Sequence, residues 1–595
     1  GFDAPALYAF TDIDRAPDTL RALLDEYERA WRFGFDQAEV DVSVASLRAQ
    51  YQTMLAGADD VRDDPRADDL VAHYIDGAPV PDDAAAARRG LAELDAVTPE
   101  ALAERFNARY TNTAPQVIVS VPHDQESEAL TADAVLAAIA ATPDRELEPR
   151  PPGAVVATEL MERPDPADPG DGRQLSQAGW ALFDPIEYTF PNGARVVLLP
   201  NAIVAGEMYL TAQSPGGTAL VAGDDLVDAM FTTEVVTSSG VGPFSKSDLS
   251  DLLAGADVEL SADLQPYTER WSGRAASSDA ETLLQLLNLY TSAPRVDPVA
   301  LNQTVQWYQP MIDDPGRDPG TAGAVALNRA RYGDSPHYSV LPTADEFATL
   351  DAEGIERVWR DRFGDVSDFT FVLAGDFDAD EMLALASAYL GTLPGSGRVD
   401  APPAVTPAAP TTPVSVAIEA GSGDTASLQI MYTTPVERLG AATDAVSDVA
   451  DSVLGARVER VVREQFGDSY SPGVAAWIDT DPDPVAIVYA YATGSPDRIA
   501  AIAETIHAEL TAMVAGDITE AEFAAAKAPV VESYQFVDNG EFMQHVLREA
   551  ADPAYDLDGY VYETADEVTI GMVKAYLAEH LPVGAYAEAI VVPRA

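Results

Sequence analysis

The sequence contains no cysteine, and only three of its 36 basic residues are lysine. The missing cysteine excludes disulfides, thiolate catalysis, iron–sulfur clusters and cysteine-type zinc sites. The few cations face 98 Asp and Glu residues, and the net charge is -62. Such a surface repels phosphates and anionic lipids, so we expect no nucleic-acid binding and no attachment to anionic membranes. The acidity is typical of a solvated, salt-adapted surface.

Long apolar runs are also missing. The longest, an Ala-rich stretch near residues 134–141, falls well short of the about 18 residues that cross a bilayer, so we expect no membrane insertion. The first residues, GFDAPALYAF, show neither a signal peptide nor an initiating methionine. We therefore expect the chain to be a fragment of a longer protein.

The composition nevertheless predicts folded domains. Hydrophobic residues make up 47% of the 595 residues, and this length predicts about three to five domains. Two segments rich in proline and glycine have the composition of extended, weakly packed linkers, namely residues 143–178 and 395–413. They divide the chain into blocks 1–142, 179–394 and 414–595.

The three blocks end alike, in LDAVTPEALAERFNARYTNTAPQVIVSVP, LDAEGIERVWRDRFGDVSDFTFVLAGD and ADEVTIGMVKAYLAEHLPVGAYAEAIVVP. Each stretch predicts a helix followed by a strand. The first and last blocks also share a helix–glycine turn–helix pattern, around Gly34 and Gly516. The middle block opens with a predicted hairpin at Asn192-Gly193. The fold class is therefore α+β, with repeated domains of which the first is only the second half of a unit.

Four segments resemble the insulinase–pitrilysin family of zinc metallopeptidases: NGARVVLLPN, GGTALVAGDDLVDAM, RFGDVSDFTFVLAGDFDADEMLALASAYLGTLP and VVREQFGDSYSP. The closest likeness is to bacterial members with four homologous domains on one chain. The resemblance covers essentially the whole sequence. It implies that block 1–142 is the C-terminal part of the second domain, 179–394 the third domain and 414–595 the fourth, and that 143–178 joins the two halves.

The resemblance also implies zinc, held in the first domain by a His-x-x-Glu-His motif. None of the six histidines of this chain stands in that motif. The equivalent helix of the third domain reads Phe231-Thr-Thr-Glu234-Val235, with apolar residues at both ligand positions, and 298–312, expected to supply the third ligand, has no carboxylate. We expect no metal ligand in this chain, and Glu234 is by default an ordinary helix residue.

Two catalytic candidates follow from the resemblance. Arg463 and Tyr470 stand in VVREQFGDSYSP, where relatives carry an Arg and a Tyr that contact the substrate beside the zinc. A guanidinium and a phenol can donate hydrogen bonds to a developing oxyanion. The alternative is structural: an arginine at a helix C-terminus and a tyrosine at a strand edge.

Other motifs have structural explanations. The run Asp479-Thr-Asp-Pro-Asp-Pro hints at calcium, but Pro484 and Ala490 stand where a calcium loop needs Gly and Glu. His337 and His545 are expected to serve loop and interface hydrogen bonds.

The sequence thus predicts the C-terminal portion of a zinc metalloendopeptidase that degrades peptides in a closed chamber, with the zinc site on a missing N-terminal portion. Linker 143–178 would be the hinge, and the chain alone would be inactive. Expected partners are that zinc-bearing portion, or a separate zinc-bearing subunit, and peptide substrates. The expected location is periplasmic or extracellular. The alternative is a non-catalytic binding or scaffold protein on the same fold.

Overall fold

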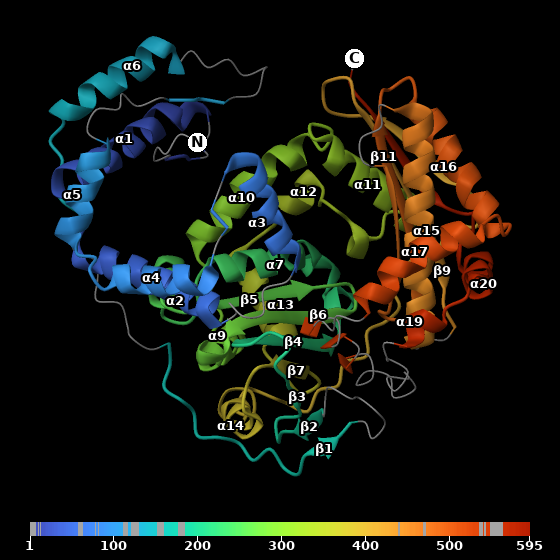
Figure 1. The fold of residues 1–595 in the computed structure, drawn as a ribbon, viewed down its shortest axis with the longest axis horizontal. Helices are drawn as coiled ribbons and strands as arrows, with labels where there is room; N and C mark the ends of the chain where they lie inside the picture. The colour runs from blue at the N-terminus through green and yellow to red at the C-terminus, as the bar shows by residue number, and fades with distance from the viewer. Residues whose placement is uncertain are drawn as a thin grey trace. The chain divides into compact units, whose positions relative to one another are not determined.

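The structure, a computed structural model, divides the chain into two compact units. One comprises residues 1–159 and 250–257, and the other comprises 160–249 and 258–595 (Figure 1). The described residues are 7–9, 11, 13–56, 63–77, 79–80, 82–110, 117–120, 130–150, 160–175, 185–437, 441–467, 472–534, 539–540, 543–544, 546–547 and 563–594.

The first unit is helical in its described part. Its helices are α1 (Ala16–Phe33), α2 (Gln37–Ala56), α3 (Asp63–Asp76), α4 (Asp83–Leu94), α5 (Pro99–Tyr110) and α6 (Ala132–Ala141). Aromatic rings of α1 pack on α5, with the Tyr27 and Phe106 centroids 5.8 Å apart. The predicted glycine turn is confirmed: α1 ends before Gly34, at φ 73°, and Asp36 and Glu39 form reciprocal caps at the start of α2.

The second unit contains a seven-stranded sheet in the order β1-β2-β3-β7-β4-β6-β5. Its strands are β1 (Arg173–Gln174), β2 (Ile186–Thr189), β3 (Arg195–Pro200), β4 (Glu207–Pro215), β5 (Val258–Leu264), β6 (Thr268–Ala276) and β7 (Thr370–Gly375). The Asn192-Gly193 hairpin joins β2 to β3 as predicted. Gly193 has φ 97°, and a Cβ there would lie 2.4 Å from the Ser367 carbonyl oxygen, so this turn requires glycine.

A five-stranded sheet follows in the order β10-β11-β9-β12-β8. Its strands are β8 (Val414–Glu419), β9 (Ala426–Pro435), β10 (Gly473–Asp479), β11 (Val485–Gly494) and β12 (Ala587–Val592). In chain order β8 to β12 occupy the same sheet positions as β3 to β7. In both sheets the first and last of these strands pair in parallel and the other pairs are antiparallel. The predicted repetition of one α+β fold is confirmed for these two blocks.

Helices of the middle block surround its sheet and extend beyond it. They are α7 (Leu226–Ser238), α8 (Lys246–Leu253), α9 (Ala280–Ser292), α10 (Pro298–Asp313), α11 (Pro319–Tyr332), α12 (Ala344–Phe347), α13 (Ala352–Phe363) and α14 (Ala379–Tyr389). Trp271 of β6 packs edge-on against Trp359 of α13, with centroids 5.6 Å apart, and both rings are buried. This contact places α13 on the sheet face to which Glu269 and Trp271 point.

The last block covers one face of its sheet with its own helices. They are α15 (Ala441–Phe466), α16 (Ile499–Val514), α17 (Glu520–Ser533), α19 (Glu563–Glu567) and α20 (Ile570–His580). Their buried side chains form one apolar cluster with β9, β10 and β11. The second helix–glycine turn–helix is confirmed: Gly516, at φ 91°, separates α16 from α17, and Thr519 and Glu522 form a capping box.

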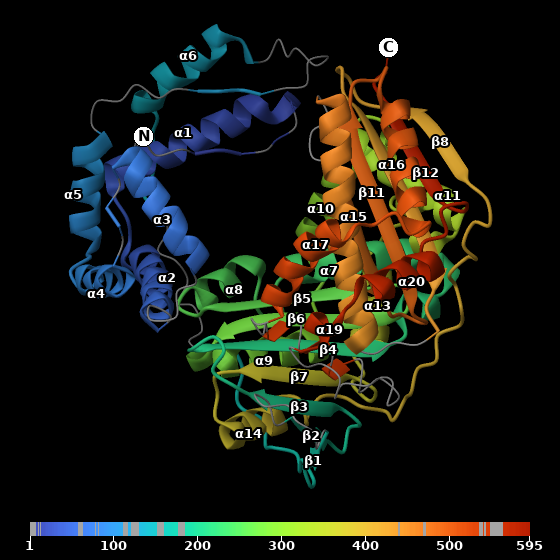
Figure 2. The same cartoon turned by 45° about the vertical axis from the view of Figure 1, so that its right-hand side comes forward.

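Each sheet also receives a cover from the other block. Ala326 and Leu327 of α11 pack on Ala587 and Ala589 of β12, and Figure 2 shows α11 beside β8 and β12. In return Met543, Val546 and Leu547 pack on β3 and β7. We call this arrangement the reciprocal cover. It buries the second apolar face of both sheets, as an α+β layer requires.

Two sequence expectations differ from the structure. The strand expected before Pro122 is absent from the described residues 117–120, where Ile118 is 91% exposed. A strand needs a neighbour to take its backbone hydrogen bonds, and no described residue of the first unit offers one. Residues 395–413 are extended as predicted, but they are not weakly packed.

We call residues 395–413 the strap, because polar side chains bind it to the middle block. The backbone N–H groups of Val405 and Thr406 donate to the Tyr267 hydroxyl, at 2.8 and 2.7 Å. The N–H of Asp400 donates to Asp368, at 2.7 Å. A proline-rich composition predicts an extended chain but does not reveal such partners. The boundaries proposed from the linkers stay predictions.

Candidate functional site

Of the two catalytic candidates the structure describes one. Arg463 lies in the last turn of α15 and forms an ion pair with Glu459 one turn earlier, with 2.7 Å between Nη1 and Oε1. Its side chain is 58% exposed, so it is accessible to a ligand. Tyr470 lies outside the described residues, so the pairing of the two side chains stays a prediction.

The helix that the resemblance in the sequence equates with a zinc-binding helix is α7. Phe231 and Val235, at the two ligand positions, are 3% and 0% exposed. The Phe231 ring packs against Tyr308 and Phe347, with centroid distances of 4.9 and 5.4 Å. Glu234 is exposed and accepts hydrogen bonds from the hydroxyls of Thr304 and Tyr308, both at 3.1 Å. These side chains belong to α10, the segment that the resemblance implies as the source of a third ligand. The position is an apolar contact that cannot hold zinc.

Two histidines of the described part, His337 and His507, form hydrogen bonds through their rings. His337 Nδ1 lies 3.1 Å from the Thr218 hydroxyl, as its loop position predicted. His507 lies between Tyr432 and Glu588, at 2.7 and 2.9 Å. His545 lies outside the described residues. Within the part of the chain that the structure describes, no three His, Asp or Glu side chains are grouped so that they could hold a metal ion.

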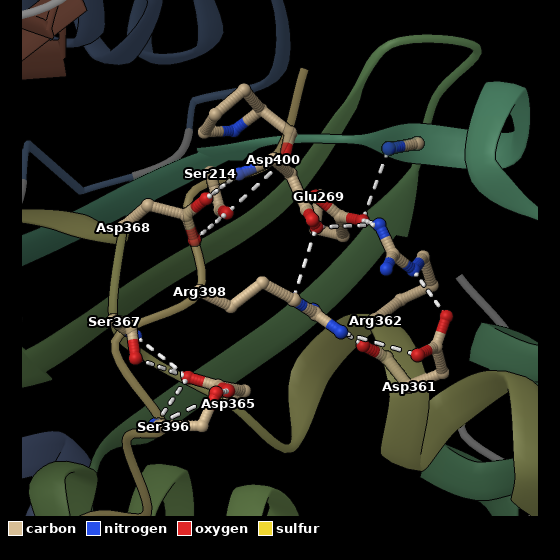
Figure 3. A network of polar contacts seen from close by, with 12 residues as sticks. Ser214, Glu269, Asp361, Arg362, Asp365, Ser367, Asp368, Ser396, Arg398 and Asp400 are labelled. Carbon is tan, nitrogen blue, oxygen red and sulfur yellow. Dashed lines mark hydrogen bonds and ion pairs between the residues drawn. The ribbon is translucent and has the colours of Figure 1, made fainter. Parts of the chain in front are cut away.

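A buried polar network joins the sheet, α13 and the strap (Figure 3). Arg362, 3% exposed, places Nη1 2.9 Å from Glu269 and 3.0 Å from Asp400. Its Nε lies 2.9 Å from Asp361, and Arg398 contacts both aspartates. Three carboxyl groups thus share two guanidinium groups. Burial raises the pKa of Glu269 to about 8, against the opposing effect of Arg362. This network fastens the strap.

A cavity of about 1050 Å³ lies between the two sheets of the second unit. Residues at the ends of β5 and β6 form one wall, and β10 with the turn 480–484 forms the opposite wall. Arg270 and Thr268 point to the cavity, because they alternate along β6 with Glu269 and Trp271, which face α13. Arg270 forms an ion pair with Asp481 across the cavity.

Sequence reasoning found part of this cavity and missed the rest. The acidic run that begins at Asp479 hints at calcium in the sequence, and in the structure it forms the cavity turn. Asp263, Thr268 and Trp477 carry no motif, and only the pairing of distant strands brings them to one cavity. No local pattern could have identified them.

Comparisons with known proteins find a family model and several relatives that resemble parts of this chain. Residues 359–530 match the family model described as "Peptidase M16 inactive domain". Over 211 residues the chain is 25% identical to the probable zinc protease PqqL of Escherichia coli, covering 34% of this chain and 22% of the relative. Over 226 residues it is 20% identical to PqqL of Haemophilus influenzae, covering 37% and 23%.

Two solved structures share the fold over nearly the whole chain. A mutant of the ferredoxin protease FusC, in complex with Arabidopsis ferredoxin, has a TM-score of 0.63 at 17% identity, and the match covers 98% of this chain and 64% of that one. The periplasmic protease PqqL of E. coli has a TM-score of 0.60 at 19% identity, covering 97% and 63%. The chain therefore spans less than two thirds of the length of these proteins.

No helix in the described part of the chain combines the length and the apolar character needed to cross a bilayer.

Proposed function

We propose a function for this chain from the premise that it resembles the C-terminal half of an insulinase–pitrilysin (M16) family zinc protease. In this proposal it is the half without metal, and it acts on peptides together with a zinc-bearing portion or a separate zinc-bearing subunit. The observation that carries the proposal is the match of residues 359–530 to the inactive domain of that family. The apolar contact at Phe231 and Val235 supports it, because these residues cannot coordinate zinc.

The residues of this chain would bind and orient the peptide. Arg463, exposed at the end of α15, would donate to a carbonyl oxygen or to the developing oxyanion of the substrate, and Tyr470 would assist. Zinc chemistry would belong to the other portion. Closure of the two halves around the peptide would exclude water.

The experiment compares the chain alone with the chain plus the zinc-bearing half from the same organism. Alone, the chain should contain no stoichiometric zinc and leave peptides uncut. The mixture should elute as one complex and hydrolyse a fluorogenic peptide in a zinc-dependent manner. A zinc-bearing half that is fully active without this chain would contradict the proposal.

A second function, a non-catalytic binding or scaffold protein, is supported by the same apolar contact at α7. In that case a complex would form but its peptidase activity would be absent. We further propose a periplasmic or extracellular location, supported by the likeness to a periplasmic protease of E. coli. Fractionation of cells of the source organism tests it.

A further inference from the structure

The cavity between the two sheets carries an unbalanced negative charge. Four aspartates line it, at positions 263, 479, 481 and 483, against one arginine, Arg270. Arg270 is already paired with Asp481. In the described part of the chain, no Lys, Arg or His forms an ion pair with the three remaining carboxylates. They favour a cation that comes from outside the chain.

A buried hydroxyl at the cavity has no hydrogen-bond partner among the described residues. Thr268 lines the cavity and is 3% exposed, and its Oγ1 forms no hydrogen bond with any described residue. A buried polar group without a hydrogen bond costs free energy. A ligand with an N–H or a C=O group would remove this cost, and a peptide backbone offers both. This observation is independent of the carboxylates.

An exposed aromatic ring lies beside the acidic turn. Trp477 is 43% exposed, and it shares a face of β10 with Asp479 because the two residues are two positions apart. Both line the cavity. A lysine or arginine side chain has an apolar stem and a charged head, so it can lie along the indole and reach the carboxylate.

The cavity carboxylates are not grouped as the ligands of one metal ion. Among the described residues no three acidic or histidine side chains come together as ion ligands. Asp263 belongs to the opposite wall from Asp479 and Asp483. An extended ligand can reach carboxylates on both walls of the cavity, whereas a single metal ion cannot.

We propose that this cavity is a subsite for the lysine or arginine side chain of a bound peptide, with Trp477 under its stem, Asp479 and Asp483 at its charged head, and Thr268 at its backbone. The inference rests on the proposed function and names its substrate class, peptides that contain basic residues.

The test measures binding by calorimetry to the full 595-residue chain, without any zinc-bearing half. The probe is acetyl-Gly-Ser-Lys-Gly-Lys-Ser-Gly-amide, and its analogue with norleucine in place of both lysines serves as the uncharged comparison. The lysyl peptide should bind at least about tenfold more tightly. D479N/D483N should weaken its binding by about threefold or more, because each exposed charge pair contributes modestly. T268V, which keeps the shape, should weaken it by about two- to tenfold.

The control is D424N/D497N, which removes the same charge at two exposed aspartates outside the cavity. It should bind the lysyl peptide as the parent does. Equal weakening by both double variants would mean general attraction to an acidic protein and would overturn the inference. Unchanged binding in D479N/D483N, or stoichiometric Ca²⁺ binding lost in that variant, would overturn it too.

Hydrolysis plays no part in this measurement, so the two proposals fail separately. A peptide that binds in the cavity, with no activity in any reconstituted complex, would refute only the proposed function. An active complex without preference for the lysyl peptide would refute only the subsite.

Discussion

At the scale of single residues, Arg463 and Glu269 show two opposite uses of charge. Arg463 is exposed and available to a ligand, whereas Glu269 is 1% exposed and fixed in a network. The first can be removed with little effect on folding. The second cannot change its charge without an effect on stability.

Arg463→Ala should lower the kcat of a reconstituted peptidase by about 10²–10³-fold if the arginine donates to the oxyanion. Zinc content should not change, since the side chain is no ligand. Tyr470→Phe removes only the hydroxyl and tests the same role. The matched control is Arg460→Ala, one turn earlier on α15, whose side chain pairs with Glu522. Parental rates in both variants would make Arg463 and Tyr470 structural.

Glu269 should make stability depend on pH. Its pKa is raised from 4.5 to about 8 in the folded protein, so between these values the folded state binds more protons than the unfolded state. The stability contributed by protonated Glu269 is complete below about pH 4.5 and is lost as the pH rises to about 8. In the pH range where only Glu269 titrates, the free energy of unfolding falls by about 1.4 kcal/mol per pH unit.

Glu269→Gln removes this titration. In urea unfolding from pH 5 to 8.5, the free energy of unfolding of the variant should increase relative to that of the parent as the pH rises. Glu281→Gln is the control, because the hydrogen bond from Arg163 lowers the pKa of Glu281 and keeps it charged throughout. The difference in free energy of unfolding between Glu281→Gln and the parent should stay constant over this pH range. A constant difference for Glu269→Gln would mean that Arg362 keeps Glu269 ionised.

At the scale of elements, one hydroxyl holds the strap at Val405 and Thr406. Tyr267 accepts two backbone hydrogen bonds from the strap and shares a third with the Thr406 hydroxyl, at 2.7 Å. Tyr267→Phe leaves two N–H groups without an acceptor, at a cost of about 1–3 kcal/mol. Hydrogen exchange at Val405 and Thr406 should become about tenfold faster or more. Tyr338→Phe, which loses only its bond to the Thr406 hydroxyl, should change exchange less.

Elements with local signals could be predicted from the sequence. The Asn192-Gly193 hairpin, the glycine turns at Gly34 and Gly516, and the helix–strand endings of the last two blocks all have local causes. The anchoring of the strap to Tyr267 and the cavity around Thr268 do not, because they depend on residues far apart in the chain. The sequence itself shows the apolar residues at positions 231 and 235, but it does not predict that Phe231 packs against Tyr308 and Phe347.

At the scale of the whole molecule, the net charge of -62 should make stability depend on salt. Mutual repulsion opposes compaction, and salt screens it over a Debye length of about 10 Å at 0.1 M. The thermal midpoint should rise from 0.01 to 0.3 M NaCl, by about 2–4 °C per kcal/mol of relieved repulsion in a domain of 150–250 residues. Near about pH 4, where carboxyl groups are partly protonated, the rise should shrink. Equal rises at both pH values would contradict a charge mechanism.

The reciprocal cover makes the last two blocks a natural split protein. Helix α11 covers the sheet of the last block, and Met543, Val546 and Leu547 cover the sheet of the middle block, so each block would expose an apolar face without the other. A protease site inserted after Ala408, an exposed position of the strap, should therefore yield a nicked molecule that elutes as one species. Either fragment expressed alone should aggregate, and co-expression should rescue both. Two separately soluble, folded fragments would show that the shared covers contribute little.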